Sequence, residues 1–330
     1  MRRNRRTCLH LLVGLVVPGA LPKSQTSSHT WRITDETWVD ADRRREIPVR
    51  LRWPDMERQG TEYPVILFSH GLGGTREGGA VWGDAWSNAG FLVIHIQHPG
   101  SDFNAVRLVT NSFENRQALR SVASPSQLVA RLGDVRFVLD EILRRKLGRL
   151  ERWGNVRASG VGMSGHSFGA HTTLGMAGQR YPVGAPILEP RLTSFIAFSP
   201  TAPIAASASA SFAMLDRPML TITGTLDDDV AGVGATPERR AAVFAALPLG
   251  NKAQLVLNGA DHMTFAGQTG RAADVIRREP VARDLQGAHH VQVASVTTDW
   301  WSATLMDDLA AAARLAVPAG LATGDLWLRK

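Results

Sequence analysis

The alternation of apolar and polar positions divides the chain into short strands and longer helices. Residues 47–54, "IPVRLRWP", alternate between apolar and mostly basic side chains, which predicts a strand with one exposed face. Residues 63–71 and 91–100, "YPVILFSHG" and "FLVIHIQHPG", are apolar runs that end in glycine. Such runs are typical of strands buried on both faces of a sheet. Between them, residues 80–90, "AVWGDAWSNAG", predict a helix that ends at a glycine.

The middle of the chain predicts a long amphipathic helix. Ser124 and Pro125 provide an N-cap followed by proline at the first helical position. Apolar residues then recur at three- and four-residue steps as far as Gly148. The preceding residues, 101–124, lack a strong pattern and are the best candidate for a segment that covers substrate.

Further strand and helix patterns alternate through the second half of the chain. The strand candidates are "VRASGVGMSG", "TSFIAFSP", "PMLTITGT" and "AQLVLNGAD", and the helix candidates are "GAHTTLGMAG", "TPERRAAVFAAL" and "DWWSATLMDDLAAAARLA". Strands alternating with helices predict an α/β fold, a mostly parallel twisted sheet with helices on both faces. No Pro- or Gly-rich linker divides the chain, so we expect a single domain.

The first 22 residues have the layout of a secretory signal. Basic residues come first, then a short apolar run over residues 9–17, then Pro18-Gly19-Ala20. Arg5-Arg6 followed by Thr7-Cys8-Leu9 also resembles a twin-arginine export signal. We therefore expect residues 1–22 to direct export, to the periplasm or outside the cell, and residues 23–330 to form the domain. The alternative is a basic tail. No apolar run reaches 18 residues, so no membrane-spanning helix is predicted.

Charge and cysteine content narrow the possible functions. The formal net charge is +7, but four arginines lie in the expected signal; without them 33 basic residues face 30 acidic ones, a balance of +3. With no dense basic stripe, nucleic-acid binding is not expected. The single cysteine, Cys8, also lies in the expected signal, so no disulfide, thiolate nucleophile or cysteine metal site is predicted.

Residues 165–169, "GHSFG", match the pattern G-x-S-x-G. The pattern alone is weak evidence, but here a predicted strand precedes it and a predicted helix follows it, which is the context of a nucleophile elbow. Ser167 would then sit on a strained turn with the N–H groups of the helix N-terminus close by. We predict that Ser167 is a nucleophile; the alternative is a structural serine in a tight turn.

A serine hydroxyl needs a general base and an orienting acid to act as a nucleophile. Asp227 follows the predicted strand "PMLTITGT", at the sheet edge where Ser167 is expected. We assign Asp227 as the acid, with Asp228 as the alternative by register. His262 follows the next predicted strand and is assigned as the base; the alternative is a histidine in a surface loop. The order Ser, Asp, His is that of nucleophile-elbow enzymes.

The glycine-rich segment "SHGLGG", residues 69–74, ends an early strand and predicts an oxyanion hole. We expect the N–H groups of Leu72 and Phe168 to bind the oxyanion. Other residues around this site are expected to contact substrate or brace the turn: His70, Gly71, His98 and His166. His289 and His290 are interpreted as solvated loop residues, because no carboxylate or cysteine stands at metal-ligand spacing. Neither a metal nor a cofactor is predicted.

Taken together, the chain resembles the α/β-hydrolases, in particular the serine-dependent relatives of dienelactone hydrolase and platelet-activating-factor acetylhydrolase. The matching segments occur in the family's order between residues 63 and 265: "SHGLGG", "IQHPGSD", "GHSFG", "GTLDD" and "GADHMTF". Dienelactone hydrolase itself uses cysteine, so Ser167 departs from it and its lactone substrate is not implied. The resemblance implies the fold, a Ser-Asp-His triad and hydrolysis of carboxylic esters without a cofactor.

The sequence thus predicts a serine ester hydrolase acting on small, short-chain esters. Two other hydrolase activities remain open, a phospholipid acyl esterase and a polyester hydrolase. A non-catalytic binding protein with the same fold is the alternative from another class, although such proteins usually lack a triad member. The oligomeric state is left open by the sequence.

Overall fold

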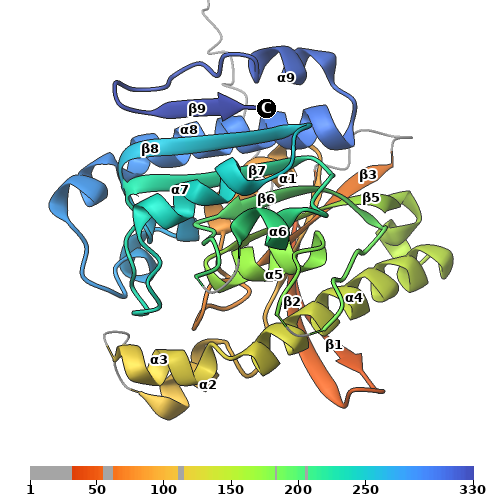
Figure 1. Ribbon diagram of the computed structural model, residues 1–330. Helices are drawn as coiled ribbons and strands as arrows, with labels where there is room; N and C mark the ends of the chain where they lie inside the picture. Colours follow the sequence, from red (N-terminus) through yellow and green to blue (C-terminus); the bar gives the residue numbers. More distant parts are fainter. Residues whose placement is uncertain (1–31, 55–61, 111–114, 183, 205–206) are drawn as a thin grey trace, which may run out of the picture. The chain divides into compact units, whose positions relative to one another are not determined.

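The computed structural model describes residues 32–54, 62–110, 115–182, 184–204 and 207–330. The expected export signal and its boundary at residue 22 lie outside these residues. Residues 32–330 form one compact unit around a nine-stranded sheet (Figure 1). The strands are β1 (Ile33–Asp40), β2 (Arg45–Arg52), β3 (Tyr63–Ser69), β4 (Leu92–Ile96), β5 (Val156–His166), β6 (Leu192–Phe198), β7 (Met219–Leu226), β8 (Lys252–Asp261) and β9 (Leu326–Arg329).

The sheet is parallel through its centre and antiparallel at both edges. The strand order is β1-β2-β4-β3-β5-β6-β7-β8-β9, and all neighbours from β4 to β8 are parallel. β1, β2 and β9 are added in antiparallel pairings. The fold class predicted from the alternating pattern is confirmed. Because the central strands are parallel, their carboxyl ends meet at one edge, where a site is expected.

Helices flank the sheet. They are α1 (Ala80–Asn88), α2 (Phe103–Val109), α3 (Arg116–Val122), α4 (Pro125–Leu147), α5 (Phe168–Met176), α6 (Ala208–Phe212), α7 (Pro237–Ala246), α8 (Pro280–Leu305) and α9 (Leu309–Arg314). Short 3₁₀ helices are η2 (Glu151–Asn155), η3 (Thr264–Ala266) and η4 (Gly270–Ala273). Within the described residues, none of the helices combines the length and apolarity that crossing a bilayer requires.

Two hydrophobic cores lie on opposite faces of the sheet. On β3, Val65 and Leu67 face the core shared with α4, α5, α6 and α7, whereas Ile66 and Phe68 face the core shared with α1, α8 and the residue that follows α9, Leu315. This alternation explains why β3 reads as a continuous apolar run. The tryptophans of α1 and α8 are fully buried in the second core: Trp82, Trp86, Trp300 and Trp301.

The structure corrects the interpretation of His289 and His290. Helix α8 begins at Pro280, well before the apolar segment that predicted a helix, and both histidines lie in it with their side chains buried. His290 contacts the carbonyl of Thr264 (3.0 Å) and His289 that of Asn258 (3.1 Å). They are thus packing residues that tie α8 to the end of β8, and not solvated loop residues. Among the described residues, no group of three or more His, Cys, Asp or Glu could hold a metal ion.

Candidate active site

Ser167 occupies a sharp turn between β5 and α5. Its φ is 56° and its ψ is −114°, a conformation that is strained for a residue with a side chain. The turn brings β5, α5 and the end of β3 so close that two glycines are required. A Cβ on Gly169 would lie 1.9 Å from the carbonyl oxygen of Ser69, and one on Gly165 would lie 2.2 Å from that of Gly169. The two glycines of the G-x-S-x-G pattern therefore serve close packing around the serine.

Asp227 and His262 come together at the same edge of the sheet. Asp227 follows β7 and His262 follows β8, and His262 Nδ1 lies 2.8 Å from Asp227 Oδ1. Both side chains are buried, whereas the neighbouring Asp228 is exposed. Of the two aspartates that the sequence left open, the geometry pairs Asp227 with the histidine.

A buried arginine on α7 lowers the pKa of both members of this pair. Arg240 Nε lies 3.0 Å from Asp227 Oδ1, and Thr223 Oγ1 donates to Asp227 Oδ2 (2.9 Å). Burial raises the pKa of Asp227, but Arg240 and the hydrogen bond from His262 outweigh it and hold that pKa at about 2. Burial and then Arg240 lower the pKa of His262, although Asp227 acts in the opposite direction. At neutral pH an aspartate anion therefore faces a neutral imidazole, which donates from Nδ1 and leaves Nε2 free to accept a proton.

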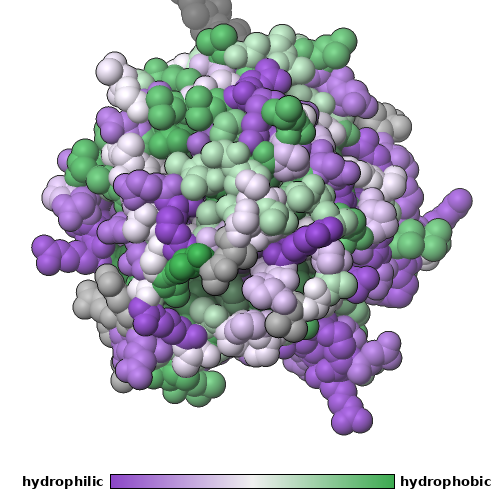
Figure 2. All heavy atoms as spheres, viewed as in Figure 1, coloured by the Kyte–Doolittle hydropathy of each residue, from purple (hydrophilic) through white to green (hydrophobic). Residues whose placement is uncertain are grey.

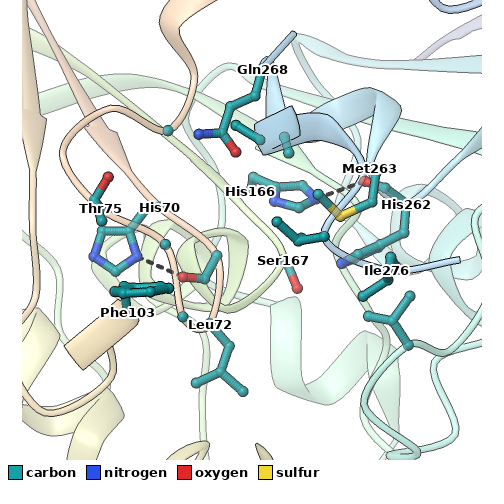
Figure 3. A pocket seen from close by; sticks show the side chains of 18 of the residues that line it. His70, Leu72, Thr75, Phe103, His166, Ser167, His262, Met263, Gln268 and Ile276 are labelled. Atoms are coloured by element: carbon teal, nitrogen blue, oxygen red, sulfur yellow. Dashed lines mark hydrogen bonds between the residues drawn. The ribbon is translucent and has the colours of Figure 1, made fainter. Parts of the chain in front are cut away.

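Ser167 and His262 line a common cavity of about 300 Å³. Figure 3 shows the Ser167 hydroxyl and the His262 imidazole turned toward this space, with Leu72 and Phe103 also in its wall. Phe103 belongs to α2 and Leu119, a further lining residue, to α3. Part of the segment that lacks a sequence pattern, residues 101–124, thus borders the cavity.

The loop after β3 is held by hydrogen bonds to the carbonyl of Gly71, which belongs to the same peptide as the N–H of Leu72. The N–H of His98 donates to His70 Nε2 (3.0 Å), so the proton of this imidazole is on Nδ1, which donates to the carbonyl of Gly71 (2.6 Å). Burial and then Arg131 lower the pKa of His70 well below its usual range, which keeps the ring neutral. In a trans peptide the N–H points opposite to the carbonyl. Fixing the Gly71 carbonyl therefore directs the Leu72 N–H.

Arg131 links this loop to the start of α5. It comes from α4, is fully buried, donates to the carbonyl of His70 (2.6 Å) and lies over the ring of Phe168, 4.3 Å from its centroid. Burial lowers the pKa of Arg131 to about 9, so it stays charged at neutral pH. The N–H of Phe168, at the first position of α5, has no partner within its own helix. Both N–H groups predicted to bind an oxyanion thus belong to segments that Arg131 contacts.

His98 was expected near the substrate, but it lies in the interior of the protein. It is fully buried and is not among the residues that line the cavity. Its Nε2 contacts Ser69 Oγ (2.9 Å) and its Nδ1 contacts Asp134 Oδ2 (2.9 Å). All three side chains are inaccessible, so this Ser-His-Asp arrangement supports the loop rather than meeting substrate.

The other three residues expected to contact substrate or brace the turn all lie at the cavity, and one of them also supports the base. His70, Gly71 and His166 all line the cavity. His166 also braces the base, because its Nε2 contacts the carbonyl of His262 (3.0 Å) and the two rings lie 4.6 Å apart. Burial and the nearby His262 lower the pKa of His166 well below its usual range, so it is neutral.

Arg131, Asp134 and Arg240 were missed by the sequence reasoning. The sequence did carry a signal for Arg131 and Asp134, since both fall among the apolar residues of the predicted helix, Asp134 between Leu132 and Val135. Position 131 falls between Leu128 and Leu132 on the apolar face of the predicted helix, and charged residues on such a face are buried only when they have partners. Nothing in the local pattern of α7 distinguishes Arg240 from Arg239 beside it.

The parallel sheet, the strained serine after β5 and the loops after β7 and β8 define the α/β-hydrolase fold. The family model described as platelet-activating factor acetylhydrolase, isoform II, matches residues 45–120. This match supports the resemblance seen in the sequence motifs, and with the fold it indicates an ester hydrolase. It spans β2 to most of α3 and includes the loop of Leu72, but not Ser167, Asp227 or His262. No curated protein matches the chain.

Proposed function

We propose that the protein is a serine carboxylic ester hydrolase in which Ser167, His262 and Asp227 form the catalytic triad. One observation carries the proposal. A serine held at φ 56° in an elbow shares a cavity with a neutral histidine, which in turn lies 2.8 Å from a buried aspartate. An arrangement of this kind serves nucleophilic acyl transfer.

In the proposed reaction, Ser167 Oγ attacks the ester carbonyl while His262 Nε2 takes its proton. Asp227 stabilises the imidazolium that forms. The N–H groups of Leu72 and Phe168 bind the oxyanion of the tetrahedral intermediate. Collapse of this intermediate breaks the bond to the alcohol oxygen, which leaves with the proton from His262. Water, deprotonated by His262, then attacks the acyl-enzyme in the same way and regenerates Ser167.

For the substrate we propose short-chain esters. The cavity of about 300 Å³ that Ser167 and His262 line supports this preference, because a cavity at the small end of ligand pockets limits the length of the group that it holds. On the face shown in Figure 2, apolar and polar side chains are interspersed and do not form a continuous apolar surface for binding lipid. A second candidate, hydrolysis of phospholipid acyl esters, is favoured by the family description; polyesters are a third.

The test is turnover of p-nitrophenyl butyrate by the purified protein and by Ser167→Ala. We expect the substitution to remove essentially all turnover while the circular dichroism spectrum and Tm stay close to those of the wild type. Ser87→Ala is the matched control, since Ser87 is a buried serine on α1, away from the cavity. Retained turnover in Ser167→Ala would refute the proposed nucleophile. Absence of turnover in the wild type, with every ester tried, would favour the non-catalytic binding protein.

A further inference from the structure

Ser167 lies at the junction of two separate cavities. The first, the cavity of about 300 Å³ described above, is called the His262 cavity and is lined by His262, Met263, Ala266, Gln268, Val275 and Ile276 among others. The second, of about 330 Å³, is called the Tyr181 cavity and is lined by Leu128, His171, Tyr181, Thr201, Val233 and Ala235 among others. Both cavities share Leu72, Ser167, Val230 and Ala231 in their walls.

The ionisable groups that line the Tyr181 cavity are neutral, ion-paired or hydrogen-bonded to backbone. Asp229 is an anion: its Oδ2 accepts from the N–H of Gly234 (2.5 Å). Burial raises the pKa of Asp229, but the backbone N–H groups of residues 232–235 outweigh this and lower it. The Tyr181 hydroxyl donates to the carbonyl of His171 (3.3 Å), and burial lowers the pKa of His171 to about 4, so that this ring is neutral.

Arg240 is engaged by the carbonyl of Ser199 (2.6 Å) and by Asp227. The wall thus holds an anion that would repel an anionic group and a cation, Arg240, that already has partners, and its other lining residues include Leu128, Val233 and Ala235. Such a wall suits an uncharged, apolar group.

The His262 cavity also lacks a partner for an anionic group. Glu77 lies at its edge and contacts Arg50 (3.4 Å). Among the described residues that line this cavity there is neither an arginine nor a lysine. A leaving group that carries a phosphate would therefore meet no fixed positive charge within this cavity; Arg277 lines only a neighbouring cavity that His262 also borders.

The position of the base determines which cavity receives the alcohol and which receives the acyl chain. In an ester hydrolase the alcohol oxygen leaves with a proton from the general base, so the alcohol must lie within hydrogen-bond reach of His262. His262 lines the first cavity and not the second. The acyl chain extends from the other side of the same carbonyl carbon. It therefore occupies the Tyr181 cavity.

We propose that the substrate is an uncharged ester with an apolar group on each side of the carbonyl, its acyl chain in the Tyr181 cavity and its alcohol in the His262 cavity. The proposal rests on the proposed function, because it takes Ser167 as nucleophile and His262 as base. At roughly 30 Å³ for each water-sized group, each cavity holds about ten non-hydrogen atoms. The selectivities for the acyl chain and for the alcohol are therefore set by different residues and vary independently.

Two valines allow a matched test. Val233 lines only the Tyr181 cavity and Val275 only the His262 cavity, and each is 45% exposed, so a larger side chain at either position imposes little cost on folding. The variants are Val233→Trp and Val275→Trp. Val291→Trp is the control, since this valine on α8 is 73% exposed and lines neither cavity.

Two substrate series are measured as kcat/KM by pH-stat: ethyl esters from acetate to octanoate, and acetate esters from methyl to octyl. We expect Val233→Trp to lower the octanoate-to-acetate ratio about tenfold or more, and to change the octyl-to-methyl ratio less than threefold. Val275→Trp should do the reverse. The control should change neither ratio.

A second pair of variants, Ala235→Leu and Ala266→Leu, fills the same cavities from buried positions and should reproduce the two patterns. If both pairs shift the two ratios together, or shift neither, the two-cavity proposal is wrong. If the patterns are exchanged, the assigned direction is wrong. In these cases the wild type still hydrolyses esters, whereas failure of the proposed function would show as no turnover of any ester by the wild type.

Discussion

Replacing Asp227 with asparagine tests the proposed triad because it removes a charge and keeps the shape. The amide can still face Thr223, whose hydroxyl accepts as well as donates a hydrogen bond. What is lost is the anion 2.8 Å from His262 Nδ1, at the moment when the imidazole becomes positive.

The separation of these atoms gives the size of the effect. Two unit charges 2.8 Å apart interact by about 6 kcal/mol at an effective dielectric constant of about 20. Since about 1.4 kcal/mol corresponds to a tenfold change in rate, this is an upper value of about four powers of ten. We expect Asp227→Asn to lower kcat/KM for p-nitrophenyl butyrate by 10³ to 10⁴, about the loss that this substitution causes in a serine-protease triad.

The matched control is Asp228→Asn, which changes the same side chain one residue along the chain. Asp228 is exposed, and we expect its substitution to change kcat/KM less than twofold. The pairing of Asp227 with His262 would be refuted as the functional one if Asp227→Asn lost less than tenfold, or if Asp228→Asn lost more than Asp227→Asn.

Four further outcomes are expected. The kcat/KM profile should rise with pH through a midpoint below 6.5, because the base must be neutral and burial lowers the pKa of His262; a midpoint at or above 6.5 would contradict this. Arg240→Met should raise this midpoint, since Arg240 lowers the pKa of His262. Arg131→Met should lower kcat about 10- to 100-fold with a change in KM of less than threefold, because oxyanion donors act in the transition state; an equal change in KM would indicate lost substrate binding instead. In urea unfolding, Gly169→Ala should cost about 3 kcal/mol or more, since its Cβ would meet backbone at 1.9 Å, whereas Gly287→Ala in α8 meets nothing and should stabilise by about 0.5–1 kcal/mol.

The central fold was predictable because its signals are local. Each buried strand reads as a short apolar run, as in β3, and α4 carries a serine cap, a proline at its first position and a regular apolar face. The edge strand β9 lacks such a signal, because "LWLR" is short and its side chains are mostly exposed. It exists only through its pairing with β8.

The sequence pattern predicted only the C-terminal part of helix α8. Its apolar character is concentrated near Trp300 and Trp301, whereas its first half carries His289 and His290, whose burial depends on the chain that follows β8. Among the described residues of segment 101–124, helices α2 and α3 bury few apolar side chains, Val106 and Leu119, so no periodic pattern marks them.

The candidate site was predictable where a residue type, a turn and an order along the chain coincide, as for Ser167 and His262. The structure brings Asp227 rather than Asp228 to His262, a choice that depends on one residue of register at the end of β7. Arg131 and Arg240 reach the site from α4 and α7. The apolar face of α4 marks position 131 as buried, but which loop or side chain Arg131 and Arg240 contact follows from helix packing on the sheet, which no local sequence pattern specifies.

The central claim is that Ser167 is an activated nucleophile, and covalent labelling tests it most directly. The purified protein is incubated with a fluorophosphonate, digested and sequenced by mass spectrometry, alongside Ser167→Ala. The account predicts one adduct per chain, on Ser167, with esterase activity lost in proportion to labelling and no adduct in the variant. An adduct on another serine, or active protein that remains unlabelled at Ser167, would contradict it.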